Sequence, residues 1–143
     1  MKIILASDHA AFHEKQELVK YLQAQHEVID VGTNNSDSTH YPEWAKKLVE
    51  HVKSENALGI LLCGSGIGVS MVANRFAGIR AALCRDEDDA KMARLHNDAN
   101  VLCLSGRKTS IDLIKKITDT FLTTSFEGGR HQDRINQFNL LGE

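Results

Sequence analysis

Cys63 ends an apolar run and leads directly into a glycine-rich segment, Gly64-Ser65-Gly66-Ile67-Gly68. The apolar residues 60–62 predict a buried strand, and residues 69–76 predict a helix. Backbone N–H groups of a strand-to-helix turn converge near the helix start, so we expect them to surround the Cys63 sulfur. The positive end of a helix lowers a thiol pKa from about 8.5 toward neutrality, which would make Cys63 a usable base or nucleophile.

The glycine spacing alone is a weak signal. Gly64, Gly66 and Gly68 follow neither the G-x-G-x-x-G dinucleotide fingerprint nor the P-loop pattern, which also needs a lysine. Val69 stands where a phosphatase loop would carry its arginine. A tight turn that merely needs positive φ angles is the alternative interpretation of the glycines. The neighbouring thiol favours the functional one.

Composition predicts one ordinary globular domain. The 143 residues are 42% hydrophobic and 25% charged with a net charge of −2, without the overall basicity of a nucleic-acid binder. The first apolar run reaches Asp8 too early for a signal peptide, and no later run is long enough to cross a bilayer. The three cysteines are predicted to be free thiols in a cytoplasmic protein, with Cys84 and Cys103 serving packing.

Apolar runs alternate with amphipathic helical segments along the chain. The predicted strands are residues 3–7, 28–31, 58–62, 79–84 and 101–104. Such βαβ alternation predicts a single Rossmann-like three-layer α/β domain, with a five-stranded parallel sheet, over residues 1–124. A C-terminal helical tail follows over residues 125–143. Pro42 is expected in the first turn of its helix, and Thr109 with Asp112 is expected to cap another.

Ligands of doubly wound sheets bind beyond the carboxyl ends of the strands. The residues at those positions are Asp8 and His9, Cys63 to Ser65, Arg85 and Asp86, and Ser105 to Arg107. They supply a carboxylate, an imidazole, a thiol, a hydroxyl and guanidinium groups. His96 lies near the start of the fifth strand and is expected to reach the same edge, with a solvated histidine as the alternative.

The tail carries two arginines at helical spacing. If the tail is helical, Arg130 and Arg134 lie one above the other, about 6 Å apart along the axis. Together with Arg107 they suit bidentate binding of a phosphate. The alternative is a solvated helix face on which Asp133 partly offsets the charge.

The motifs together resemble the type B ribose-5-phosphate isomerases, which are related to galactose-6-phosphate isomerase subunits. The resemblance runs nearly end to end. Its carriers are Ser7-Asp8-His9, Gly32-Thr33, Tyr41-Pro42, the Cys63 to Gly68 segment, Asn74 to Arg80, His96-Asn97-Asp98, and Glu127 to Gln132 with Arg134. Taken together they are specific, whereas each one alone is not.

The resemblance implies an intramolecular oxidoreductase that interconverts ribose 5-phosphate and ribulose 5-phosphate without metal or cofactor, by ring opening and enediolate proton transfer. It implies Cys63 as the base, Ser65 as its hydroxyl partner, and His96 as the ring-opening residue with Asp8 nearby. The substrate-binding residues it implies are Asp8, His9, Tyr41, Gly64, Ser65, Gly66, Ile67, Gly68, Asn97, Arg107, Arg130 and Arg134. It further implies a homodimer, in some relatives paired into a tetramer, whose site spans the subunit boundary.

Two departures from the family pattern are small. Ser65 stands where many members carry threonine, which retains the hydroxyl, and Ala73 and Asn74 occupy the stretch where some relatives place a glutamate base. Three alternatives stay open: an isomerase of a six-carbon sugar 6-phosphate of allose or galactose type, a non-catalytic sugar-phosphate-binding subunit, and a flavodoxin-like nucleotide-binding module. The partner in the first two is a small sugar phosphate, with neither nucleic acid nor membrane.

Overall fold

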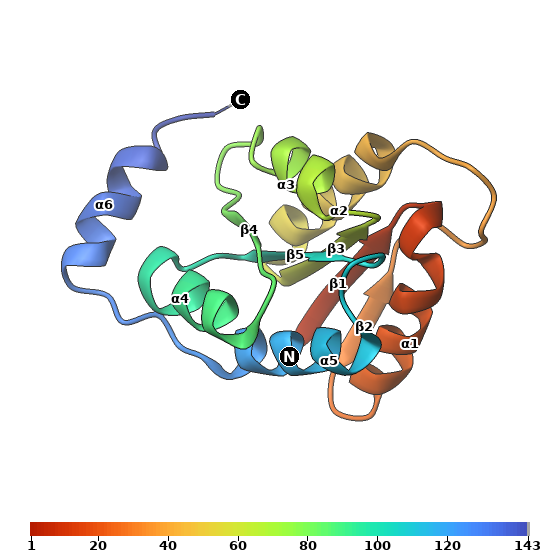
Figure 1. Cartoon of the computed structure of the whole chain (residues 1–143). Coiled ribbons are helices and arrows are strands. Elements are labelled where there is room, and N and C mark those ends of the chain that lie inside the picture. Colours follow the sequence, from red (N-terminus) through yellow and green to blue (C-terminus); the bar gives the residue numbers. More distant parts are fainter. Residues whose placement is uncertain (143) are drawn as a thin grey trace.

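The computed structural model describes residues 1–142, which form one twisted parallel sheet between two helical layers (Figure 1). The sheet order within these residues is β2-β1-β3-β5-β4, and every pairing is parallel. The strands are β1 (Lys2–Ser7), β2 (Glu27–Asp30), β3 (Leu58–Cys63), β4 (Ala81–Leu83) and β5 (Val101–Ser105). The predicted Rossmann-like α/β class is confirmed.

The helices divide between the two faces of the sheet. A short 3₁₀ turn, η1 (His9–Ala11), leads into α1 (Phe12–Gln23), which packs with α4 (Glu87–Asn97) and α5 (Ile111–Thr123) over one face. The opposite face is covered by α2 (Tyr41–Glu55) and α3 (Ile67–Ala73). The last helix, α6 (Arg130–Phe138), packs against α4 at one end of the molecule.

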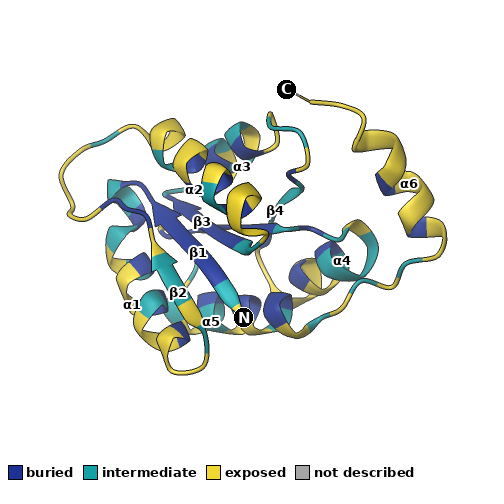
Figure 2. Cartoon of the chain, turned by 180° about the vertical axis from the view of Figure 1, so that it is seen from behind, coloured by how far each residue is buried: buried dark blue, intermediate teal, exposed yellow. Residues whose placement is uncertain are grey.

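Alternate residues of each strand feed two separate hydrophobic cores. Ile3 and Leu5 of β1 join the α1 and α5 side, whereas Ile4 and Ala6 join the α2 and α3 side. The central strands β1, β3 and β5 are almost entirely buried, and Figure 2 shows the edge strand β2 as intermediate to exposed. Burial on both faces explains why the strands read as continuous apolar runs rather than as alternating ones.

The sheet order reverses at β1, which lies between β2 and β3. Ser7 pairs with Leu62, and Cys63 pairs with Ser105. The residues that follow β1, β3 and β5 therefore emerge side by side at one carboxyl edge. That switch point is where the sequence predicted the site.

Two local predictions differ from the structure. β4 spans three residues rather than the predicted run 79–84, and just before it the Arg80 N–H donates to the Asn100 side chain. The cap of α5 is Ser110, whose Oγ accepts from the Leu113 N–H at 3.2 Å, and not the predicted Thr109. The position of Pro42 in the first turn of α2 is confirmed.

The outer edge of β4 is occupied by a side chain. Asn74 donates from its amide nitrogen to the Ala81 carbonyl at 2.9 Å and accepts from the Ala81 N–H at 2.8 Å. These are the two hydrogen bonds that a neighbouring strand would make.

Within residues 1–142, none of the helices is long and apolar enough to span a membrane.

Candidate active site

Cys63 is the last residue of β3 and is 5% exposed. The Gly66 N–H donates to its Sγ at 3.1 Å, so one of the expected backbone donors does point at the sulfur. The Ser65 Oγ accepts from the Ile67 N–H at 3.1 Å, which fixes the hydroxyl beside the same turn. The turn thus holds a thiol and a hydroxyl at the N-terminus of α3.

Close packing explains the glycines of this turn. Gly66 has φ +77°, and a Cβ there would lie 2.6 Å from Leu83 Cδ1 and 2.9 Å from the Leu104 carbonyl carbon. At Gly68 a Cβ would lie 2.6 Å from the Tyr41 ring. The absence of side chains therefore lets β5 and Tyr41 approach the turn, and a side chain at either position would push them away.

The turn is also bound to the residues that follow β5. The Gly106 N–H donates to the Cys63 carbonyl at 2.9 Å, and the Arg107 N–H donates to the Gly64 carbonyl at 3.1 Å. The Ser105 hydroxyl donates to the same Gly64 carbonyl at 2.7 Å. These bonds bring the Arg107 side chain over Gly64, where its Nη1 would lie 3.3 Å from an added Cβ.

The end of β1 supplies a carboxylate and an imidazole. Asp8 caps η1, because its Oδ1 accepts from the Ala10 N–H at 3.0 Å. The Nδ1 of His9 accepts from the Thr39 N–H at 3.2 Å, and the Trp44 indole N–H donates to the Thr39 hydroxyl at 3.0 Å. Accepting at Nδ1 leaves the proton of a neutral ring on Nε2, so His9 offers a donor at that atom.

These residues line one open cleft of about 620 Å³. Nine predicted site residues are among its walls: Asp8, His9, Tyr41, Cys63, Gly64, Ser65, Ile67, Gly68 and Arg107. Gly66 lies buried behind the turn. Ala10 and Met71 also line the cleft without having been predicted. Met71, on α3 and 67% exposed, gives no sequence signal beyond its large apolar side chain at the surface.

Four predicted residues lie outside this cleft. His96 and Asn97 belong to the last turn of α4, while Arg130 and Arg134 belong to α6. Asn97 lines a separate cavity of about 420 Å³ between β4 and the tail. The expectation that His96 reaches the Cys63 edge of its own chain is wrong, because a crossover helix starts at the carboxyl edge of a parallel sheet and ends at the amino edge.

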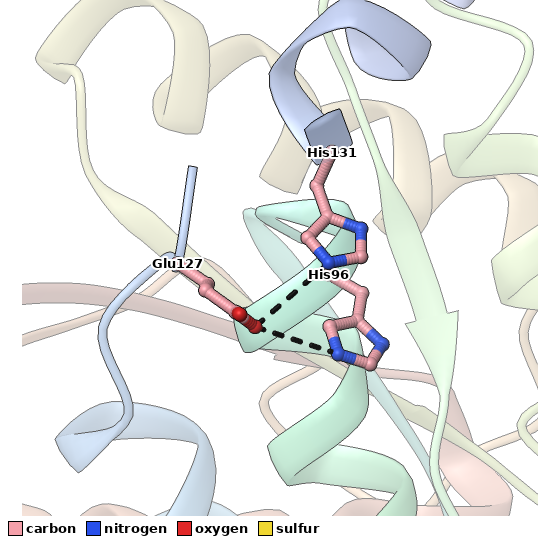
Figure 3. A group of neighbouring side chains, drawn as sticks. All are labelled: His96, Glu127 and His131. Atoms are coloured by element: carbon pink, nitrogen blue, oxygen red, sulfur yellow. Dashed lines mark ion pairs between the residues drawn. The ribbon is translucent and has the colours of Figure 1, made fainter. Parts of the chain in front are cut away.

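His96 instead belongs to a group of three side chains, His96, Glu127 and His131, which we call the histidine cluster (Figure 3). The two imidazole rings stack with centroids 4.3 Å apart. Their Nε2 atoms lie 3.6 and 3.8 Å from the Glu127 Oε2. Glu127 and His131 are not among the predicted site residues. The signal available there was their i, i+4 spacing.

The other two cysteines are not reactive candidates. Burial, reinforced by the carboxylates of Asp89 and Asp86, raises the pKa of Cys84 to about 12. Burial raises the pKa of Cys103 as well. Both thiols are therefore protonated at neutral pH, as expected for packing residues, and all three cysteines of the chain are unpaired.

Comparison with known proteins places this geometry in a family. Residues 3–138 match the Ribose/Galactose Isomerase family. Ribose-5-phosphate isomerase B of Escherichia coli is 44% identical over 98% of this chain and 95% of its own. The Thermotoga maritima ribose 5-phosphate isomerase structure superposes with a TM-score of 0.95 at 50% identity, covering 98% of each chain.

A further solved structure carries a ligand. Ribose-5-phosphate isomerase B from Mycoplasma genitalium, with bound ribulose-5-phosphate, is 42% identical with a TM-score of 0.93, covering 97% of this chain and 94% of its own. The fold and these similarities define a sugar-phosphate isomerase of the α/β class. The chain belongs to the Ribose/Galactose Isomerase family.

Proposed function

We propose that this isomerase interconverts ribose 5-phosphate and ribulose 5-phosphate by opening the furanose ring and moving a proton between neighbouring carbons through an enediolate. The observation that carries the proposal is the Cys63 thiol, which accepts the Gly66 N–H in a cleft also lined by Asp8, His9 and Arg107. Membership of the family and the ligand named for the Mycoplasma relative support the same substrate.

Cys63 is the base in this proposal, and Ser65 assists at the sugar oxygens. The Gly66 N–H lies 3.1 Å from Sγ and donates to the sulfur that would take up the substrate's proton. An enediolate develops negative charge on oxygen only as the reaction proceeds, so N–H groups of residues 64–68 act mainly on the transition state. One such donor is typically worth about 3–4 kcal/mol.

Anion binding in the cleft falls to His9 and Arg107. The Thr39 N–H occupies Nδ1 of His9, which leaves an Nε2–H donor for a phosphate oxygen. The planar guanidinium of Arg107 can bind two phosphate oxygens at once. Their contribution is orientation of the substrate over Cys63, rather than bond making.

The remaining predicted residues come from a second copy of the chain in this proposal. His96, Asn97, Arg130 and Arg134 lie outside the Cys63 cleft of their own chain. A homodimer that brings the α4 end and the α6 tail (residues 125–143, of which Glu143 lies outside the described residues) to the partner's cleft would complete the site. His96 would then open the ring near the partner's Asp8. Pairs of such dimers would form a tetramer.

The cell compartment proposed for the enzyme is the cytoplasm. Its three free thiols, including the proposed base, suit a reducing environment.

The decisive experiment assays the purified chain against ribose 5-phosphate, allose 6-phosphate and galactose 6-phosphate. We expect turnover of ribose 5-phosphate, and the other two sugars test the six-carbon alternative. Cys63→Ala should lose ketose formation by at least about 10²-fold, the typical contribution of a positioned base, while still binding substrate. Cys84→Ala is the matched control. Full activity of Cys63→Ala would refute the mechanism, and binding without turnover by the native chain would indicate a non-catalytic subunit.

A further inference from the structure

The histidine cluster joins three potential metal ligands from two helices and the segment between α5 and α6. His96 comes from the last turn of α4, Glu127 from the segment before α6, and His131 from the first turn of α6. One ligand atom from each lies within 4.8 Å of the other two. Figure 3 shows both rings turned with one nitrogen toward the carboxylate.

Backbone contacts hold these residues in place. The Glu127 N–H donates to the Leu95 carbonyl at 3.0 Å, which ties the tail to the residue before His96. The His131 N–H donates to the Gly128 carbonyl at 3.2 Å. One turn further along α6, Ile135 is buried. The cluster therefore lies at the junction between α4 and α6, with His131 buried and with His96 and Glu127 open to solvent.

Two imidazoles and one carboxylate are a donor set of catalytic zinc sites, which keep their fourth position open. The His131 side chain is only 8% exposed, whereas that of Glu127 is 58% exposed. Glu127 supplies a negative charge, while Arg130 and Arg134 oppose a cation.

We propose that the histidine cluster is a binding site for a zinc-like divalent cation, and that its occupancy inhibits the isomerase by engaging His96. The inhibitory part rests on the proposed function, in which His96 opens the sugar ring. Such a cation takes no part in the isomerisation itself. The site would make the enzyme sensitive to the free concentration of zinc or of a metal with similar ligand preference.

The stacked rings make a specific demand on metal binding. Their planes differ by 15°, so the lone pairs of the two imidazoles lie in nearly parallel planes and do not converge on one point. In a tetrahedral zinc site the ligand atoms lie about 3.3 Å apart, given zinc–nitrogen distances of about 2.0–2.1 Å. One ring must therefore turn. His96 is 40% exposed and has the freedom to do so.

Zinc binding is tested by calorimetric titration of the full chain with Zn²⁺ alone. The experiment compares the native sequence with His131→Gln and Glu127→Gln, and uses His13→Gln, on the exposed surface of α1, as the matched control. All four are also prepared with Cys63→Ser, because a thiolate is a competing zinc ligand. We expect one equivalent per chain, weakened at least about tenfold by His131→Gln and by Glu127→Gln but not by His13→Gln.

A second readout follows the rings themselves. Unstacking of His96 from His131 should shift both sets of imidazole proton resonances on addition of Zn²⁺, and His13 should not respond. Zinc affinity that is equal in all variants, or binding that leaves the His96 and His131 resonances in place, would overturn the site.

Inhibition is measured as loss of isomerisation with added Zn²⁺. The midpoint of inhibition should coincide with the midpoint of binding and should move to higher zinc in Glu127→Gln. An active enzyme that neither binds nor responds to zinc would refute the metal site and leave the proposed function intact. A chain that binds zinc at the cluster but shows no isomerase activity in metal-free buffer would refute the proposed function and the inhibition, and leave the binding site intact.

Discussion

Gly66 and Gly64 belong to the same turn, but an added methyl group would meet different atoms at each. At Gly66 the φ angle is +77° and the methyl would lie 2.9 Å from the Leu104 carbonyl carbon, which is backbone and cannot move away easily. At Gly64 it would meet only the flexible end of Arg107, at 3.3 Å.

We expect Gly66→Ala to lower the free energy of unfolding by roughly 1–3 kcal/mol, because the residue would be strained as well as crowded. Gly64→Ala should lower it by well under half of that amount. Urea unfolding of the two variants measures the difference. Equal losses would mean that crowding by Leu104 and Leu83 does not limit residue 66.

At the scale of the residue, sequence reasoning identified the side chains that directly follow a strand. Asp8, His9 and Cys63 lie at the ends of β1 and β3, and Arg107 lies two residues after the end of β5, so their meeting at one edge follows from the parallel sheet alone. Met71 could not be predicted in this way. It reaches the cleft from a helix face, and its position depends on how α3 packs.

Among the elements, α1 is held to the end of β2 by an ion pair between a buried lysine and an aspartate whose side chain is 26% exposed. The Lys15 side chain is fully buried, and its Nζ lies 2.6 and 2.8 Å from the two Asp30 oxygens. The same Nζ donates to the Thr33 carbonyl at 2.8 Å. Lys15 thereby also fixes the start of the loop that follows β2, in which Thr39 donates its backbone N–H to His9.

Lys15→Met should destabilise the fold by about 1–3 kcal/mol, because it removes the charged hydrogen bonds to Asp30 and leaves the Thr33 carbonyl without this donor. Lys20→Met, at an exposed position of the same helix, is the control and should change little. Chemical denaturation measures both, and the double variant Lys15→Met/Asp30→Asn should regain part of the loss. A loss below about 1 kcal/mol for Lys15→Met would show that the pair contributes little.

The attachment of α6 to α4 should depend on pH. Enclosure of His131, with His96 next to it and Arg130 and Arg134 on its own helix, lowers its pKa in the folded chain, although Glu127 acts in the opposite direction. The unfolded chain therefore binds this proton more readily. The stability contribution is fully present above the ordinary histidine pKa of 6.5 and is lost as the pH falls through the lowered value.

We expect His131→Gln to lose less stability than the native chain when the pH is lowered from about 7.5 to about 5.5. Denaturant unfolding at the two pH values, compared between the variant and the native chain, isolates this residue from the other titrating groups. If the variant and the native chain lose the same unfolding free energy between the two pH values, His131 is equally easy to protonate in the folded and the unfolded chain.

The elements themselves were predictable where periodicity is strong, and less so where side chains bond the backbone. The Asn100 carboxamide bonds Arg80 just before β4, and the Asn74 carboxamide bonds Ala81 at the outer edge of β4. No apolar pattern encodes such bonds. The position of His96 at the amino edge could have been predicted from the direction of the crossover helix, since each such helix returns the chain to the start of the next strand.

At the scale of the whole molecule, the proposed site requires two chains. Cys63→Ala and His96→Gln should each be inactive alone, because each damages every site of its own homodimer. Mixing them with subunit exchange should restore about a quarter of native activity, since half of the dimers are mixed and each has one intact site. Activity of the mixture is the measurement, and a solution mass gives the oligomer.

The control is a solution that contains both homodimers but in which the subunits have not exchanged. If the exchanged mixture stays as inactive as that solution, His96 does not act across a subunit boundary.

The Asn74 carboxamide also protects the edge of the sheet against strand pairing with another copy of the chain. The edge strand of a sheet has unpaired backbone N–H and C=O groups, which can pair with a strand of another chain and so begin aggregation. Here a single amide group already satisfies Ala81, so the molecule carries its own stand-in for a sixth strand. Without the Asn74 carboxamide, the edge of β4 beside α3 would be free to pair with a strand of another copy, and the folded protein would aggregate.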